Sequence, residues 1–118
     1  MGDRCVAVVD GDPAVRDSLA TLMELNGHEV ATYSTARAFL RAMDGQHIDC
    51  IICEADLPDG TGVELYRTVA ETLPHTRFAL LVSRQEAPTV SKAKRAGIHN
   101  IFSKPLVHRK LLRFVAGG

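Results

Sequence analysis

Five short apolar runs that alternate with helical periodicity are the feature that most constrains how this chain folds. Each run is five or six residues long, and together they occupy residues 5–9, 29–33, 48–53, 78–82 and 98–102. The first, third and fourth are nearly continuous in apolar character, which is typical of strands covered by helices on both faces of a parallel sheet. The pattern predicts five strands.

The segments between these runs change to the three- and four-residue spacing of amphipathic helices. Asp12 is a good N-cap for the first of them, and Pro13 suits the first helical position. Glycines after the helical segments, such as Gly27, Gly97 and Gly117, are typical of helix ends. The apolar stripes are Val15, Leu19, Leu22 and Met23; Ala36, Phe39, Leu40 and Met43; Tyr66, Val69, Ala70 and Leu73; Val90, Ala93 and Gly97; Leu111, Leu112 and Val115.

A strand followed by a helix, repeated five times, restricts the topology. Parallel strands joined through helices require right-handed crossovers, so an open doubly wound α/β sheet with helices on both faces is expected. In such sheets, ligands and chemistry collect at the carboxyl ends of the strands, beside the switch in strand order. The residues that directly follow each predicted strand are therefore the first place to look for a site.

Length and composition limit the alternatives. A chain of 118 residues fits one domain, and we expect residues 1–118 to form it. The 14 Lys and Arg balance the 14 Asp and Glu, so no overall field draws the chain to nucleic acid. The apolar run near the N-terminus is too short for a signal peptide or membrane span, which predicts a cytoplasmic protein. Direct nucleic-acid contact and membrane association are not expected.

The three cysteines are expected to be reduced and buried. Cys50 and Cys53 form a Cys-x-x-Cys pattern, but they lie within a predicted strand rather than at a helix N-terminus. Three residues of separation in a strand place the two side chains on opposite faces. We therefore expect no redox or metal role for this pair.

Polar residues follow four of the predicted strands. They are Asp10, Glu54, Ser83 and Lys104, the last followed by Pro105. Two carboxylates, a hydroxyl and an ammonium on one rim suit metal-assisted handling of a phosphoryl group, because oxygens hold a hard cation and donors hold phosphate oxygens. A charge-balanced loop rim with no chemistry explains the same residues equally well.

At these residues the sequence resembles the receiver domains of bacterial response regulators, most closely the nitrogen-fixation regulator type. Residues 8–19, Val-Val-Asp-Gly-Asp-Pro-Ala-Val-Arg-Asp-Ser-Leu, resemble the acidic segment of that family, and residues 54–62, Glu-Ala-Asp-Leu-Pro-Asp-Gly-Thr-Gly, resemble its phosphoacceptor strand and loop. By the resemblance, Ser83 takes the position of the hydroxyl residue of the family's switch, and Lys104 takes the position of the lysine in its phosphorylation site. The resemblance also implies a cis peptide bond between Lys104 and Pro105. It implies a flavodoxin-like (βα)5 three-layer sandwich whose five parallel strands have the order 2-1-3-4-5.

The chain departs from the family at three positions. Glu54 stands where the family has the aspartate that accepts the phosphoryl group, Gly11 replaces a second acid next to Asp10, and Ile101 replaces the switch aromatic. The extra methylene of Glu54 extends its carboxylate into the space through which phosphorus must approach. The same carboxylate, being longer, could reach Lys104 and Ser83 directly and imitate part of a phosphoryl group.

These departures also weaken the cation site that the resemblance implies. Asp10, Glu54 and Asp56 are the candidate Mg²⁺ ligands, while Asp12 is a doubtful substitute for an acid at position 11 because it is expected to cap the first helix. We expect no cofactor apart from weakly held Mg²⁺.

The leading hypothesis is an atypical receiver domain of a two-component phosphorelay protein, a signalling module and not an enzyme, that is independent of phosphorylation or imitates it through Glu54. One alternative is a Mg²⁺-dependent receiver that uses another acid, Asp10, Asp12 or Asp56. Another is a flavodoxin-like module that binds a small ligand. The chain either acts alone or belongs to a longer regulator.

The resemblance also implies protein partners. They are a histidine kinase or phosphorelay protein and an output domain or effector protein. A homodimer through the fourth helix, fifth strand and fifth helix is a further expectation, since these elements carry basic residues that suggest a shared surface. The basic residues are Lys92, Lys94, Arg95, Arg109, Lys110 and Arg113.

Overall fold

The structure is a computed structural model that describes residues 3–83 and 87–117. Within these ranges no helix has the length and apolar character needed to cross a membrane. The elements in chain order are β1 (Cys5–Val9), α1 (Pro13–Leu25), β2 (Glu29–Tyr33), α2 (Ala36–Ala42), β3 (Cys50–Glu54), β4 (Asp56–Leu57), β5 (Gly60–Thr61), α3 (Gly62–Thr72), β6 (Arg77–Val82), α4 (Ala87–Ala96), β7 (Asn100–Ser103) and α5 (His108–Ala116).

The main sheet has five parallel strands in the order β2-β1-β3-β6-β7. This is the predicted doubly wound fold, and the strand numbers differ from the order 2-1-3-4-5 only because β4 and β5 form a separate antiparallel pair. That short hairpin, Asp56–Leu57 with Gly60–Thr61, was not predicted. Two-residue strands carry too little apolar pattern to be recognised in a sequence.

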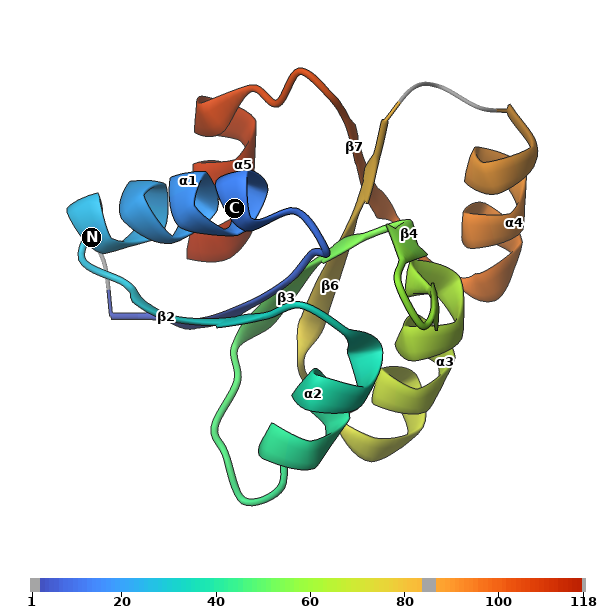
Figure 1. The fold of residues 1–118 in the computed structure, drawn as a ribbon, viewed down its shortest axis with the longest axis horizontal. Coiled ribbons are helices and arrows are strands. Elements are labelled where there is room, and N and C mark those ends of the chain that lie inside the picture. Colours follow the sequence, from blue (N-terminus) through green and yellow to red (C-terminus); the bar gives the residue numbers. More distant parts are fainter. Residues whose placement is uncertain (1–2, 84–86, 118) are drawn as a thin grey trace.

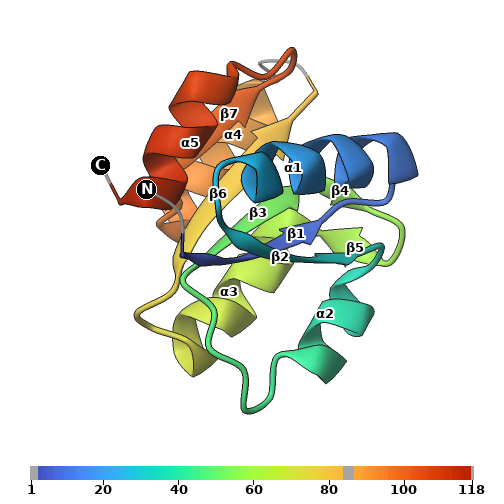
Figure 2. The ribbon, with the colours of Figure 1, turned by 90° about the vertical axis from the view of Figure 1, so that its left-hand side faces the viewer.

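Helices cover both faces of the sheet and enclose two cores (Figure 1). On one face α1 and α5 lie side by side and bury Leu19, Met23 and Phe114 against the sheet. On the other face α2, α3 and α4 bury Phe39 and Val69, among others. Figure 2 shows the three layers in profile, with the edge strand β7 between α5 and α4. The three-layer sandwich is confirmed.

Two strands, β3 and β7, start two residues later than predicted for local reasons. β3 begins at Cys50 and not at residue 48, because the Asp49 carboxylate instead accepts a hydrogen bond from the Cys5 amide at 2.8 Å. β7 begins at Asn100 because Ile98 belongs to the turn that ends α4, where its amide donates to the Ala93 carbonyl. An apolar side chain at a buried turn was therefore mistaken for strand pattern.

The predicted helix ends are present. Asp12 caps α1 by accepting a hydrogen bond from the Ala14 amide at 2.9 Å. Gly97 and Gly117 follow α4 and α5 with φ of +107° and +92°, a left-handed conformation that favours glycine. Asp12 thus fixes where the loop after β1 ends at the carboxyl edge of the sheet, whereas the two glycines lie at the opposite edge.

Cys50 and Cys53 point to opposite faces of β3, as predicted. Cys50 packs in the α1 and α5 core and Cys53 in the other, and both are free thiols. Burial raises the pKa of Cys50 to about 11 and also raises that of Cys53. Thiols held in this protonated state are poor nucleophiles and poor metal ligands.

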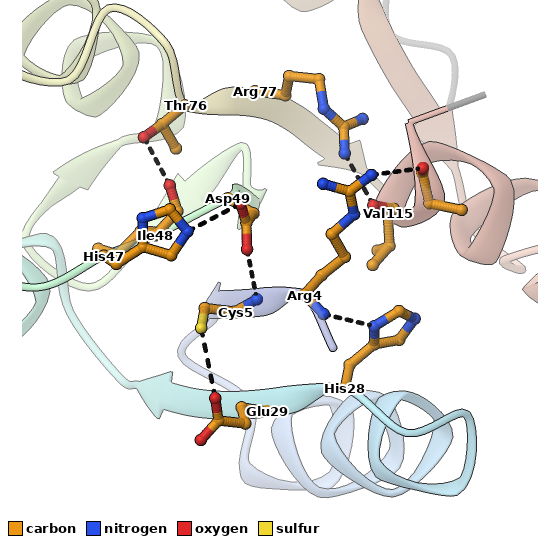
Figure 3. A network of polar contacts seen from close by, with 11 residues as sticks. Arg4, Cys5, His28, Glu29, His47, Ile48, Asp49, Thr76, Arg77 and Val115 are labelled. Carbon is orange, nitrogen blue, oxygen red and sulfur yellow. Dashed lines mark hydrogen bonds and ion pairs between the residues drawn. The ribbon is translucent and has the colours of Figure 1, made fainter. Parts of the chain in front are cut away.

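A polar network ties the amino ends of the strands to the end of α5 (Figure 3). Arg77 donates to the carbonyls of Phe114 and Val115 and lies over the Phe114 ring, while Arg4 donates to the carbonyl of Ala116. The last carbonyls of a helix lack partners within it, so both guanidinium groups cap α5. This anchors α5 on the sheet at the edge opposite the strand ends that carry Asp10 and Glu54.

His28 in the same network makes stability depend on pH. Its Nδ1 accepts a hydrogen bond from the Arg4 amide at 3.2 Å, which requires the neutral ring. Burial lowers the His28 pKa below its ordinary value of 6.5. A lowered folded-state pKa means that the unfolded chain binds the proton more tightly, so this stabilisation is complete above pH 6.5 and is lost as the pH falls below it.

We therefore expect the free energy of unfolding to fall between pH 7.5 and 5.5, and His28→Asn, which keeps an acceptor near Nδ1, to reduce that slope. Urea titrations across this range measure it. His75→Asn, at an exposed position, is the matched control and should leave the slope unchanged. Equal slopes in the wild type and His28→Asn would contradict the assignment.

Candidate functional site

Four strands of the main sheet deliver the predicted site residues to one edge. Asp10 follows β1, Glu54 ends β3, Ser83 follows β6 and Lys104 follows β7. Parallel strands end at the same edge, so these side chains converge although they are far apart in sequence. They share a surface hollow of about 520 Å³ whose lining residues are Asp10, Gly11, Asp12, Glu54, Asp56, Leu57, Pro58, Ser83 and Lys104.

The centre of the site is an ion pair between Glu54 and Lys104. The Lys104 Nζ donates to Glu54 Oε2 at 2.6 Å and lies 4.0 Å from Asp10 Oδ2. Glu54 is 6% exposed and Asp10 2%, so two buried carboxylates share one ammonium. The second distance is too long for a hydrogen bond, and among the described residues Asp10 Oδ2 has no hydrogen-bond donor.

Burial and charge shift the pKa of both partners. Burial raises the pKa of Glu54 above its ordinary 4.5, and the nearby Asp10 carboxylate acts in the same direction, while Lys104 opposes both. For Lys104, burial acts to lower the pKa, but the hydrogen bond and negative charge of Glu54 outweigh it and raise the pKa above 10.5. Lys104 is therefore a fixed positive charge at neutral pH, and it favours the ionised form of Glu54.

The segment after β1 holds Asp10 in place but adds no further acid to the centre. Asp10 Oδ1 accepts from the Asp12 amide at 2.9 Å, and the Asp10 carbonyl accepts from Arg16 at 2.8 Å. Asp12 is exposed and caps α1, as expected. The role of Arg16 was not predicted; the only signal in the sequence is a long donor one turn after a helix N-cap.

The chain after Glu54 is fixed by a close approach of α3 to β3. Gly62 begins α3, and its amide donates to the Ala55 carbonyl at 2.9 Å. A Cβ at Gly62 would lie 2.6 Å from the Glu54 carbonyl oxygen and 2.5 Å from Leu80, so a larger residue would displace the strand end. The capping box of Thr61 and Glu64 holds α3 in register with this contact. The backbone of Glu54 is consequently packed directly against the start of α3.

The remaining predicted residues lie at the rim. Ser83 is exposed and lines the hollow, but within the described residues the Glu54 carboxylate is hydrogen-bonded to Lys104 and not to Ser83, so the predicted contact with Ser83 is absent. Ile101 is half-buried and packs against the core beneath α2, α3 and α4. The peptide between Lys104 and Pro105 is cis, as the resemblance implied. Of the predicted residues, Asp10, Glu54 and Lys104 form the centre.

The residues present fit Mg²⁺ poorly. The predicted ligands Asp10, Glu54 and Asp56 do not form a metal-binding group, and no such group of three His, Cys, Asp or Glu occurs in residues 3–83 and 87–117. Lys104 already lies where it neutralises Asp10 and Glu54, and Gly11 offers no side-chain oxygen. Asp56, in β4, is exposed. A divalent cation would have to displace an ammonium from its hydrogen bond.

The comparisons with known proteins identify the family. The family model described as response regulator receiver domain matches residues 6–116, and the chain therefore belongs to the response regulator receiver domain family. FixJ of Bradyrhizobium diazoefficiens, a transcriptional regulatory protein, is 26% identical over 93% of this chain and 54% of its own length. The response regulator protein TmoT of Ectopseudomonas mendocina is 29% identical over 91% of this chain and 49% of its own.

Solved structures agree on the fold. A receiver domain protein from Methanospirillum hungatei superposes with a TM-score of 0.89 at 23% identity, covering 98% of this chain and 92% of that one. The BeF3-activated receiver domain of DrrB, a Thermotoga maritima protein, gives 0.87 at 29% identity, covering 98% and 96%. This chain spans about half the length of the curated relatives FixJ and TmoT.

Proposed function

We propose that this chain is an atypical receiver domain in which Glu54 takes the place of the phosphorylated aspartate, so that the module signals without accepting a phosphoryl group. The observation that carries the proposal is the 2.6 Å contact between Glu54 Oε2 and Lys104 Nζ. The donor that would bind a phosphoryl oxygen is already engaged by a carboxylate of the protein. Glu54 supplies one negative charge where phosphorylation supplies up to about two, so the imitation is partial.

The absence of a switch aromatic supports a fixed module over a switch. Ile101 has neither a hydroxyl nor an aromatic ring, and it is half-buried against the core. A branched aliphatic side chain at a packed position has one preferred rotamer and no polar group to report a change at Ser83. The ion pair of Glu54 and Lys104 and the packed Ile101 are therefore both suited to a module that keeps one conformation.

The proposal is tested by incubating the chain with a small phosphodonor and Mg²⁺ and measuring its intact mass. We expect no addition, because the Glu54 carboxylate is held against Lys104. A receiver domain that has the usual aspartate is the positive control in the same mixture. A stable, acid-labile phosphoryl group located at Glu54 by peptide mapping would overturn the proposal.

The same experiment decides between the alternatives. The Mg²⁺-dependent receiver predicts a label on Asp10, Asp12 or Asp56 that Asp10→Ala abolishes. Asp10 is the one buried acid of the three, and its Oδ2 lacks a donor, which is the observation that favours it. The small-ligand module predicts a bound cofactor in purified protein. None of the described residues that line the hollow is aromatic, so stacking of a flavin or base there has no support.

The partners of the chain are proposed from its relatives. We propose that the chain works as part of a longer regulator, because its relatives FixJ and TmoT are about twice as long. Partners would be a histidine kinase or phosphorelay protein and an output domain or effector, and a cytoplasmic location is proposed from the family alone. We also propose a homodimer through α4, β7 and α5; the NtrC4 receiver domain is described as a dimer.

A further inference from the structure

The hairpin of β4 and β5 follows Glu54 almost directly and forms one wall of the hollow at the site. Leu57, in β4, and Pro58, in the turn, both line that hollow. Leu57 is buried in the core beneath α2, α3 and α4, whereas Pro58 is exposed and faces the loop after β1. The contacts that fix this hairpin therefore also fix the wall of the site.

Asp59, in the turn of the hairpin, ties it to a helix that begins more than twenty residues earlier. Its Oδ1 accepts a hydrogen bond from the Ala36 amide and its Oδ2 accepts one from the Arg37 amide, both at 3.0 Å. These amides open α2 and have no partner within that helix, while the N-cap Thr35 accepts from the Ala38 amide. Figure 2 shows β5 close to the start of α2. One carboxylate thus joins the loop after β3 to the loop after β2.

The hairpin is held at its other end as well. Its second strand leads into α3 through the capping box of Thr61 and Glu64. The hydrogen bonds from Arg37 and Ala36 hold the pKa of Asp59 below its ordinary 3.8, so this carboxylate is ionised at neutral pH. A negative charge is favourable at the start of a helix, which strengthens the attachment to α2.

The ring of Pro58 lies in the space where a side chain at position 11 would begin. A Cβ added to Gly11 would lie 3.0 Å from Pro58 Cγ and 3.1 Å from its Cδ, and the Ser34 carbonyl oxygen would lie 3.9 Å away. The first two distances are shorter than ordinary van der Waals contact. A side chain at position 11 therefore fits only if the ring retreats, and the next residue, Asp59, is bonded to α2.

We propose that the β4–β5 hairpin is a clamp in which Asp59 holds Pro58 against Gly11, closing the position from which a second acid would help to hold a divalent cation. The inference rests on the proposed function and deepens it, because a closed cation position leaves the Lys104 ammonium as the partner of Glu54. Asp59 is a positioning residue that acts through Pro58, and it is not among the described residues that line the hollow.

The test compares the Mn²⁺ affinity of Gly11→Asp/Glu54→Asp with that of the same chain carrying Asp59→Ala as well, by water proton relaxation. We expect Asp59→Ala to tighten Mn²⁺ binding about tenfold, because release of the ring relieves overpacking at position 11. The sign of the change is informative. Loss of a carboxylate weakens the attraction for a cation, and a loosened fold also binds less tightly, so neither effect produces a gain.

Three matched variants in the same background locate the effect. Pro58→Ala removes the ring but keeps the Asp59 carboxylate, and it should give a similar gain. Asp59→Asn keeps one acceptor oxygen for the amides of α2, so its gain should be smaller. Asp44→Ala, at an exposed position in the loop after α2, removes the same charge and should not tighten binding. Circular dichroism checks that each variant is folded, and if Asp59→Ala unfolds the chain, Pro58→Ala decides.

The outcomes that would overturn the clamp are definite. Equal or weaker Mn²⁺ binding after Asp59→Ala in a folded chain is one, and a gain from Asp59→Ala that Pro58→Ala does not reproduce is another. A third is the failure of every variant to bind Mn²⁺, since something other than the hairpin would then close the position. No phosphodonor is used, so these failures leave the account of Glu54 intact, whereas phosphorylation of the unmodified chain at Glu54 would overturn the proposed function.

Discussion

Lys104→Met is expected to lower the free energy of unfolding by about 3 kcal/mol at neutral pH. The substitution keeps the length of the side chain but leaves Glu54 and Asp10, 6% and 2% exposed, without the ammonium that they share. Removing one partner of a buried ion pair costs more than the pair contributes, because an uncompensated charge remains buried. Urea titration with circular dichroism measures the change.

Two further variants and the pH dependence of the loss serve as controls for this prediction. Glu54→Gln/Lys104→Met should recover most of the loss, since no unpaired carboxylate remains at position 54. Lys92→Met, at an exposed lysine, should change stability by less than about 0.5 kcal/mol. Without Lys104 the Glu54 pKa rises further, and a raised folded-state pKa is stabilising at low pH, so the deficit should shrink as the pH falls toward 4.5. Equal loss in the single and double variants would contradict the pairing.

The second large effect is a gain of phosphorylation in Gly11→Asp/Glu54→Asp. Shortening residue 54 by one methylene withdraws the carboxylate from Lys104, and an acid at position 11 restores a ligand oxygen for Mg²⁺. A Cβ at Gly11 would lie 3.0 Å from Pro58 Cγ and 3.1 Å from Cδ, so the ring must move by a few tenths of an ångström to admit it. We expect labelling by a small phosphodonor to rise roughly 100-fold over the wild type.

Intact mass measured over time gives this rate. Glu54→Asp alone should label more slowly than the double variant because it still lacks the second acid. Omission of Mg²⁺ should abolish the gain. A wild type that labels as fast as the double variant would show that the longer carboxylate is no obstacle.

The fold was predictable because both the apolar pattern of its strands and the residues at its helix ends are clear in the sequence. The buried strands β1, β3 and β6 are apolar almost throughout, and Asp12, Gly97 and Gly117 mark helix ends that the structure reproduces. The features of the fold that were not predicted are local. The β4–β5 hairpin is too short to have a period, and Ile98 is buried at a turn that resembles a strand in sequence.

The members of the site were predictable, and so was the contact of Glu54 with Lys104, but the expected contact of Glu54 with Ser83 was wrong. Placing Asp10, Glu54 and Lys104 at the same edge follows from parallel strands, and the structure brings them together. Whether Glu54 contacts Lys104, Ser83 or both depends on side-chain distances, and a sequence does not contain these distances. In the structure Glu54 is hydrogen-bonded to Lys104 and not to Ser83, and Asp56 lies outside the centre. The support given by Arg16 and Gly62 depends equally on distances in the folded chain.

The most direct test of the account is nitrogen-15 NMR of the lysine ammonium groups in the unmodified chain. The chain has four lysines, and Lys92, Lys94 and Lys110 are exposed, so their Nζ protons should exchange rapidly with water. Lys104, hydrogen-bonded to Glu54 at 2.6 Å, should give one slowly exchanging Nζ signal that Glu54→Gln weakens or shifts. Four rapidly exchanging signals, unchanged by Glu54→Gln, would contradict the occupied site on which the proposed function depends.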